Sequence, residues 1–300
     1  MKKTHEHSIA VLGGDQRQIF MAKALSKMGK ALNIWGLKAP ESATAIHCAD
    51  WKEAVKRSSY ILLPLPATID GVRINAPLAP DPESIRIDSL MREAENKVLL
   101  GGKLSEGFLQ AAENNGVNCY DYFLCESLQL KNALLTAEAA IELAMRELPV
   151  TLDGAPIAIV GYGRIGELLA QKLIALGAVV TVYARREEVL VRASLAHCKT
   201  EKLLLNDNET PLQSIDPSTR IVFNTVPKVL FSKAVLASFP KSCIFIDLAS
   251  FPGGIDQHAA KELGIKSIWA TALPGKYAPE TAGYILAQTV NSYIEKIEAT

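Results

Sequence analysis

Residues 157–170, IAIVGYGRIGELLA, decide the fold of the second half of the chain. The apolar run Ile157–Val160 is followed by the pattern GxGxxG at Gly161–Gly166 and then by a helix-forming stretch, Glu167–Leu176. This order predicts a buried strand, a tight turn and a helix, and a second strand at Val179–Tyr183 completes the βαβ step. In that context the glycine pattern indicates a dinucleotide site.

Each glycine of the loop has a physical task in such a site. Gly161 permits the tight turn, Gly163 lets the backbone approach a pyrophosphate, and Gly166 lets the helix pack closely on the strand. The N-terminus of the helix offers free N–H groups to the phosphates. A tight turn without a ligand is the alternative. We expect the whole loop to bind the cofactor: Gly161, Tyr162, Gly163, Arg164, Ile165 and Gly166.

The end of the second strand indicates which dinucleotide is bound. Sites for NAD usually place Asp or Glu about 20 residues after the glycine loop, to bind the ribose 2′-hydroxyl. The chain instead reads Ala184-Arg185-Arg186, with no acid before Glu187. Two guanidinium groups suit a 2′-phosphate by charge and geometry, so we expect NADP rather than NAD. A pair of solvated arginines is the alternative.

Two further turns follow predicted strands of the same half. One ends the strand Ile221–Asn224, and the other follows the strand Cys243–Asp247. Ligands of doubly wound sheets bind at the carboxyl ends of the strands. We expect both turns to contact the cofactor on its nicotinamide side, and a plain Asx or Ser turn is the alternative for the second turn. The residues concerned are Asn224, Thr225, Val226, Pro227, Leu248 and Ala249.

Strands alternate with helices in both halves, which predicts parallel sheets with helices on both faces. We predict an α/β protein with two Rossmann-like doubly wound parallel-sheet domains and an inter-domain cleft. Residues 1–128 are expected to form a catalytic or substrate domain that the helix 280–300 completes, 129–150 a connecting helix, and 151–279 the NADP-binding domain. The remaining strands are expected at Ser8–Gly13, Ala31–Trp35, Tyr60–Leu65, Lys97–Leu100, Gly116–Tyr120, Leu203–Leu205 and Ser267–Trp269.

Composition and charge exclude several classes of function. Lys plus Arg and Asp plus Glu both total 32, so the formal net charge is zero and no nucleic-acid partner is expected. No apolar run approaches the ~20 residues of a membrane span, and residues 1–7 lack the apolar core of a signal peptide. The 5 cysteines form no CxxC pair and the 5 histidines are isolated, so we expect no metal site. These features predict a cytoplasmic protein.

The first half has a glycine pair after its first strand, at Gly13-Gly14-Asp15-Gln16-Arg17. The GxGxxG spacing is missing and Asp15 would repel a phosphate, so we expect no second nucleotide there. We expect Asp15 and Arg17 to point into the cleft between the domains. The segment Pro66–Pro82 has no helical period, which is typical of a functional or mobile loop.

Five segments together resemble the A subunits of bacterial dipicolinate synthases. They occur in the same order over nearly the whole chain, so the resemblance is more specific than any single motif. The segments are GGDQRQ at 13–18, NALLTAEAAI at 132–141, GYGRIG at 161–166, ARR at 184–186 and LPGKYAPETAG at 273–283.

The resemblance implies an NADP-dependent oxidoreductase of the mother cell of spore-forming bacteria. It would convert a dihydro- or hydroxytetrahydrodipicolinate precursor to dipicolinate (pyridine-2,6-dicarboxylate). A flavoprotein-like B subunit is the implied partner, and we expect homo- and hetero-oligomers.

A dicarboxylate substrate needs cationic or hydrogen-bonding partners. Candidates are Arg17, Thr281, and Asn132 with Thr136, which lie one turn apart on the predicted helix Glu126–Leu148. Polar residues that simply face water are the alternative for the helix.

Removal of a ring proton would be assisted by a general base, for which Asp15 and Glu138 are candidates. Lys276 lies on a loop after Pro274-Gly275 and is the candidate for binding an acidic group or placing the nicotinamide. These three residues are the expected catalytic set, and a solvated loop lysine is the alternative for Lys276.

Two other functions are compatible with the sequence. One is an NAD(P)-dependent reductase or dehydrogenase of a small hydroxy or keto acid. Enzymes of that class carry a catalytic histidine in a late loop, where this chain has Lys276 instead. The other is a non-catalytic NADP-binding subunit that regulates its partner or serves as its scaffold.

Overall fold

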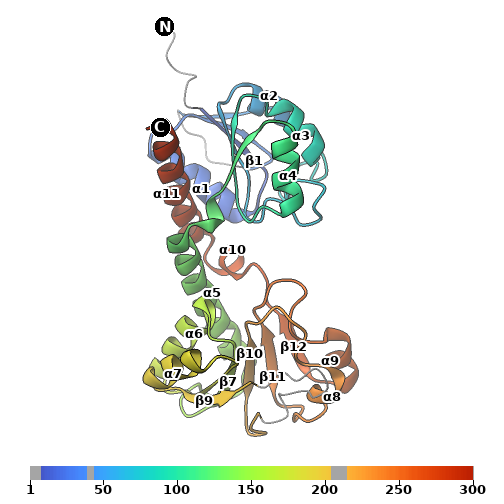
Figure 1. The fold of residues 1–300 in the computed structure, drawn as a ribbon, viewed down its shortest axis with the longest axis vertical. Coiled ribbons are helices and arrows are strands. Elements are labelled where there is room, and N and C mark those ends of the chain that lie inside the picture. The colour runs from blue at the N-terminus through green and yellow to red at the C-terminus, as the bar shows by residue number, and fades with distance from the viewer. Residues whose placement is uncertain (1–7, 39–43, 204–214, 300) are drawn as a thin grey trace. The chain divides into compact units, whose positions relative to one another are not determined.

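The computed structural model describes residues 8–38, 44–203 and 215–299 of the chain. The polar start with His5 and His7 lies outside these ranges, as do the last two residues of the strand expected at Leu203–Leu205. The chain divides into two units (Figure 1). The unit boundaries fall within helix α5 (Glu126–Glu147) and helix α10 (Leu273–Tyr277).

Unit 1 consists of residues 1–131 and 275–300. Its strands form one parallel sheet in the order β3-β2-β1-β4-β5-β6. The strands are β1 (Ile9–Leu12), β2 (Leu32–Trp35), β3 (Ala45–His47), β4 (Tyr60–Leu62), β5 (Val98–Gly101) and β6 (Asn118–Asp121). The helices are α1 (Gln16–Lys27), α2 (Trp51–Lys56), α3 (Ile87–Glu93), α4 (Glu106–Asn114), the 3-10 turn η1 (Tyr122–Leu124) and α11 (Pro279–Glu298).

The central strands of the unit 1 sheet are buried on both faces. Ile9 and Val11 of β1 join the core under α1 and α11, whereas Ala10 and Leu12 join the core under α2, α3 and α4. Figure 1 shows α1 and α11 side by side on one face. Strands that are buried on both faces have continuous apolar sequences, which is why the sequence predicts β1.

Unit 2 consists of residues 132–274 and repeats this architecture. Its parallel sheet has the order β12-β11-β10-β7-β8-β9. The strands are β7 (Pro156–Val160), β8 (Val179–Ala184), β9 (Lys199–Lys202), β10 (Ile221–Asn224), β11 (Ile244–Asp247) and β12 (Lys266–Trp269). The helices are α6 (Arg164–Ala175), α7 (Glu187–Leu195), α8 (Lys233–Leu236) and α9 (Gln257–Leu263).

The two faces of the unit 2 sheet carry different helices. Ile157 and Ile159 of β7 pack with α5, α6 and α7, and Ala158 and Val160 pack with α8 and α9. Counted within each unit, both sheets have the strand order 3-2-1-4-5-6 of doubly wound Rossmann sheets. The predicted fold class is therefore confirmed for both sheets.

The sequence patterns fail at the sheet edges. They do not predict strand β3, and β9 lies at Lys199–Lys202 instead of beginning at Leu203. Most residues of these two edge strands are exposed, so neither strand has the apolar run that marks a central strand.

Candidate dinucleotide and substrate sites

The glycine loop of unit 2 connects β7 to α6 at the point where the strand order reverses. Gly161 has φ +92°, a backbone conformation that only glycine adopts easily. A Cβ atom there would collide with Oγ1 of Thr225, and a Cβ atom on Gly166 would collide with the carbonyl oxygen of Gly161. The first and third glycines are therefore required by the packing of the loop itself.

Gly163 differs because its Cβ position is open. It has φ −88° and ψ −163°, is exposed, and has no heavy atom within 4 Å of an added Cβ. Gly163 is the N-cap residue of α6 and has no side chain to cap the helix. The neighbouring residues leave this position open, as the close approach of a pyrophosphate to the backbone requires. The loop fits a dinucleotide.

Arg185 and Arg186 follow β8 directly and are both exposed, whereas Ala184 is buried. Arg186 Nη1 lies 3.2 Å from Glu188 Oε1, and both side chains of this ion pair are largely in water. Such pairs contribute little, about 0–1 kcal/mol, so Arg186 is easily recruited by a stronger anion. Within the part of the chain that the structure describes, the Arg185 side chain forms no ion pair or hydrogen bond.

The two turns after β10 and β11 are tied together by buried polar side chains. Asn224 and Asp247 are fully buried, and Asn224 Nδ2 donates to Asp247 Oδ1 at 2.8 Å. Asp247 Oδ1 also accepts from the backbone N–H of Ala249 at 3.1 Å, and its Oδ2 accepts from that of Gly254 at 2.7 Å. These bonds hold the turn that begins at Leu248 and Ala249 against the turn at Asn224.

The side chains of Asn224 and Thr225 therefore form hydrogen bonds that stabilise the turns. Asn224 Nδ2 also donates to the carbonyl of Val226 at 2.9 Å, and Thr225 Oγ1 donates to that of Val160 at 3.0 Å. Pro227 is exposed and Val226 half-buried at the same edge. In this turn, the atoms left for the predicted cofactor contact are therefore mainly the backbone atoms and the side chains of Val226 and Pro227.

Asp247→Asn should destabilise unit 2 by about 1–3 kcal/mol, because one amide oxygen cannot accept from donors on both sides of the carboxylate. Asp256→Asn is the matched control. Asp256 caps α9 by accepting from the Ala259 N–H, and Asn caps helices equally well. Chemical denaturation of both variants measures the difference. Equal stability of the two variants would contradict the assigned role of Asp247.

At the carboxyl edge of the unit 1 sheet, Asp15 and the buried Arg17 form an ion pair. Asp15 Oδ1 accepts from the Arg17 backbone N–H at 3.0 Å and so caps α1. The guanidinium Nη2 lies 2.7 Å from Asp15 Oδ2 and donates to the Leu65 carbonyl at 2.5 Å. Nη1 of Arg17 makes no hydrogen bond to the described residues, which leaves one nitrogen for a ligand.

The segment after β4 covers the glycine pair of unit 1. The Gly14 N–H donates to the Asn75 carbonyl at 2.9 Å, and a Cβ on Gly13 would lie 2.6 Å from Cβ of Ala76. The position equivalent to the unit 2 glycine loop is thus filled by residues of the same chain, with the Asp15 carboxylate at the helix N-terminus. The Gly14 N–H is thus already bonded and a carboxylate caps the helix, and both features disfavour a pyrophosphate here.

Gly275 packs directly on the Asp15–Arg17 pair. A Cβ atom on Gly275 would lie 2.9 Å from Arg17 Nε and 3.0 Å from Asp15 Oδ2. The adjacent Lys276 is exposed and forms no ion pair within residues 8–38, 44–203 and 215–299, and Thr281 is exposed in the first turn of α11. Lys276 was expected on a loop, but it lies in the short helix α10, because residues 273–277 form one helical turn before Pro279 begins α11. Of the predicted site residues, the structure thus brings Asp15, Arg17 and the α10 segment that carries Lys276 together.

The predicted site residues of α5 are placed differently. Thr136 is buried and its hydroxyl donates to the carbonyl of Asn132 at 2.8 Å, within the helix. Glu138 is exposed and accepts from Lys172 Nζ of α6 at 2.9 Å. Glu138 is therefore part of a surface ion pair of unit 2.

Sequence reasoning missed the partners that come from loops. The Leu65 carbonyl binds Arg17, and the fully buried Tyr122 donates from its hydroxyl to the Leu63 carbonyl at 3.0 Å. Burial raises the pKa of the Tyr122 phenol, which keeps the group protonated as a donor. No spacing in the sequence marks these contacts, because they join the ends of different strands.

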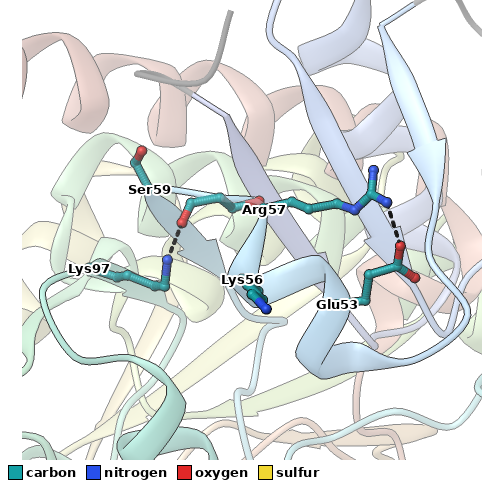
Figure 2. A pocket seen from close by; sticks show the side chains of 6 residues that line it. Glu53, Lys56, Arg57, Ser59 and Lys97 are labelled. Carbon is teal, nitrogen blue, oxygen red and sulfur yellow. Dashed lines mark hydrogen bonds and ion pairs between the residues drawn. The ribbon is translucent and has the colours of Figure 1, made fainter.

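A depression of about 650 Å³ lies at the opposite, amino-end edge of the unit 1 sheet (Figure 2). Lys97 Nζ donates to the Ser58 carbonyl at 2.6 Å, and Arg57 pairs with Glu53 at 2.7 Å. Burial lowers the pKa of Lys97. Doubly wound sheets bind ligands at the carboxyl ends of their strands, not at this edge. We therefore interpret the cationic side chains of the depression as stabilising the C-terminal end of α2, and not as a ligand site.

Other kinds of site find no support within the described ranges. They hold no cluster of three or more His, Cys, Asp or Glu placed to bind a metal ion. Burial raises the pKa of four cysteine thiols, whereas hydrogen bonding from Ser127 lowers that of Cys125. No helix of the described chain is long and apolar enough to cross a bilayer.

Two parallel sheets of the 3-2-1-4-5-6 order, one with an open glycine loop, define a two-domain Rossmann-type α/β protein. Residues 8–123 match the family model of the N-terminal domain of the dipicolinate synthase A subunit. Over 294 residues the chain is 30% identical to the dipicolinate synthase A subunit of Bacillus subtilis (strain 168), with 97% of both chains covered. The chain belongs to the family of dipicolinate synthase A subunits, as the sequence resemblance predicted.

Solved structures of the family have the same fold. The crystal structure of the dipicolinate synthase A subunit from Bacillus halodurans matches with a TM-score of 0.85 and 25% identity, covering 97% of this chain and 98% of that chain. The A chain of dipicolinate synthase from Bacillus subtilis matches with a TM-score of 0.84 and 28% identity, covering 100% of this chain and 98% of that chain.

Proposed function

We propose that this chain is the NADP-linked oxidoreductase component of a dipicolinate synthase. Its relatives carry the name of that enzyme's A subunit. The observation that carries the proposal is the open Cβ position of Gly163. The two exposed arginines after β8 support the choice of NADP.

The proposed reaction forms an aromatic pyridine ring. A hydroxytetrahydrodipicolinate precursor loses water to give the dihydropyridine, which then loses a hydride and a proton to give dipicolinate. The nicotinamide of NADP supplies the hydride acceptor when bound. Aromatisation provides its own driving force, so the residues of the chain mainly need to position the ring and accept the proton.

The carboxylates of the substrate need cationic or hydrogen-bonding partners. In unit 1, Nη1 of Arg17, Lys276 and Thr281 are the proposed partners, and in unit 2 Asn132 and Thr136. Asp15 and Glu138 are proposed as proton acceptors. Asp15 is the better supported of the two, because it lies beside Gly275 of α10, the helix that carries Lys276, whereas Glu138 pairs with Lys172.

Gly275→Ala should lower the affinity for dipicolinate about tenfold, because the added Cβ would push α10, which carries Lys276, away from the Asp15–Arg17 pair. Lys276→Ala should give a loss of similar size if α10 acts through this lysine. Gly107→Ala, an open position in α4, is the control and should bind normally. Calorimetric titration measures all three. Normal binding by Gly275→Ala would remove α10 from the site.

We further propose that the chain acts with a flavoprotein-like B subunit, in homo- and hetero-oligomers, in the cytoplasm of a sporulating mother cell. The relatives are named after one component of a multi-subunit enzyme, which supports a partner. Turnover by the purified chain alone would exclude a purely regulatory or scaffolding role. Turnover of lactate-like acids instead of the dihydropyridine would favour the hydroxy-acid alternative.

The deciding experiment is a titration of the purified chain with NADP and with NAD, each with and without dipicolinate. We expect preference for NADP, a change in affinity when dipicolinate is present, and one cofactor per chain because residues 75–76 fill the equivalent place in unit 1. Binding of neither cofactor would overturn the proposal.

A further inference from the structure

One loop of unit 2 presents a large aromatic side chain to solvent. Phe251 follows β11 and is 85% exposed, and its ring lies against that of Trp269 at the end of β12. The ring centroids are 6.4 Å apart with planes inclined by 31°. Trp269 is itself 38% exposed. The two rings form a surface that we call the aromatic shelf.

The exposure of Phe251 is not the result of a loose loop. Trp269 Nε1 donates to the Ala249 carbonyl at 3.0 Å, and the Gly253 N–H donates to the Ser250 carbonyl at 2.8 Å. Gly254 is bound on both sides: its N–H donates to the buried Asp247, and its carbonyl accepts from Leu230. Bonds to three neighbouring segments therefore fix the position from which Phe251 projects.

The location of the shelf favours a small-molecule ligand. Phe251 lies two residues beyond Ala249, at the carboxyl ends of β11 and β12, which is the edge where doubly wound sheets bind their ligands. A phenylalanine side chain left in water lacks about 1.5–3 kcal/mol of stabilisation that burial would give. A fixed and exposed ring at this edge therefore indicates a ligand that covers it.

The chemistry of the loop indicates the kind of occupant. Residues 249–254, Ala-Ser-Phe-Pro-Gly-Gly, contain no cation, so this loop offers a carboxylate no charged partner. A flat, electron-poor ring suits an aromatic face, because offset stacking places its positive edge over the electron-rich surface. Pyridine dicarboxylates combine such a ring with charges at its rim, which other residues can bind.

We propose that the aromatic shelf of Phe251 and Trp269 stacks on the ring of the pyridine dicarboxylate and selects planar cyclic dicarboxylates over acyclic ones. This inference rests on the proposed function and adds the residues that recognise the ring. The carboxylates are then bound by residues outside the loop.

The test compares two ligands on the full chain in the presence of NADP. Dipicolinate has the ring, and iminodiacetate has the same carboxylate–carbon–nitrogen–carbon–carboxylate skeleton without it. The chain has 3 tryptophans, of which Trp35 and Trp51 are buried in unit 1. We expect dipicolinate to quench the emission of Trp269, excited at the red edge of the indole band, and iminodiacetate to leave it unchanged. Trp269→Phe should abolish the quenching.

Phe251→Leu keeps an apolar side chain but removes the ring, and should weaken dipicolinate binding roughly threefold to tenfold. Phe251→Tyr keeps the ring and should bind dipicolinate normally. Val229→Ala removes exposed apolar surface from the neighbouring loop and is the control. Iminodiacetate affinity should be the same in all three variants, and their melting temperatures should equal that of the unsubstituted chain.

The outcomes separate the shelf from the proposed function. Unchanged dipicolinate binding by Phe251→Leu, or equal loss for both ligands, would overturn the shelf and leave the function standing. Weaker NADP binding by Phe251→Leu would assign the ring contact to the cofactor and also overturn the shelf. An unsubstituted chain that binds NADP but not dipicolinate would overturn the proposed substrate, and the shelf with it.

Discussion

Gly163→Val should abolish measurable NADP binding, a loss of at least about a hundredfold, while the chain stays folded. The added side chain would occupy the open space where the pyrophosphate must approach the backbone. The backbone angles, φ −88° and ψ −163°, lie in the extended region that valine adopts readily. Calorimetric titration with NADP and a thermal melt measure the two parts of this expectation.

Two other glycines test whether the effect is specific. Gly107→Val places the same side chain in open space on α4 and should bind NADP normally. Gly161→Ala should instead destabilise unit 2, because its φ of +92° and the contact with Thr225 leave no room for a Cβ atom. NADP binding retained by Gly163→Val would mean that the loop is only a structural turn.

Arg185→Ala combined with Arg186→Ala should weaken NADP binding about ten- to a hundredfold and leave NAD binding nearly unchanged. Each guanidinium forms charge-assisted hydrogen bonds with a phosphate, and NAD lacks the 2′-phosphate. Because both side chains are exposed, salt screens the contact, and the NADP affinity of the unsubstituted chain should fall as ionic strength rises. The double variant should lose most of that salt dependence.

A charge-matched control separates local contact from net charge. Arg86→Ala with Arg92→Ala removes two exposed arginines from the region of α3 in unit 1, where both pair with Asp88. This variant should prefer NADP as strongly as the unsubstituted chain. Equal losses of NADP and NAD affinity in the Arg185/Arg186 variant would refute the assignment of these arginines to the 2′-phosphate.

The central strands and the glycine loop were predictable because their physical requirements are local. An apolar run such as Ile157–Val160 indicates a strand buried on both faces. The spacing of Gly161, Gly163 and Gly166 indicates a tight turn, a backbone open to a pyrophosphate and close packing of helix on strand. The edge strand Ala45–His47 was not predictable, since most of its residues face solvent and its pairing depends on β2.

The candidate site was predictable as residue types but not as contacts. The sequence indicated Asp15 and Arg17, yet not that they pair with each other and that Arg17 binds the Leu65 carbonyl. The sequence also indicated the turn at Asn224, but not that the Asn224 side chain donates a hydrogen bond to Asp247. These contacts join strand ends that are distant in sequence, and no periodicity encodes them.

The close packing of α11 on α1 sets an order for folding during synthesis. A Cβ atom on Gly283 would lie 2.6 Å from the Arg17 carbonyl, so the two helices meet at backbone distance, and α11 buries Leu286, Val290 and Ile294 in the unit 1 core. Unit 2 is one continuous stretch that emerges from the ribosome before α11 does. Unit 2 can therefore fold first. Most of unit 1 is translated earlier, but its core is complete only after α11 has been synthesised.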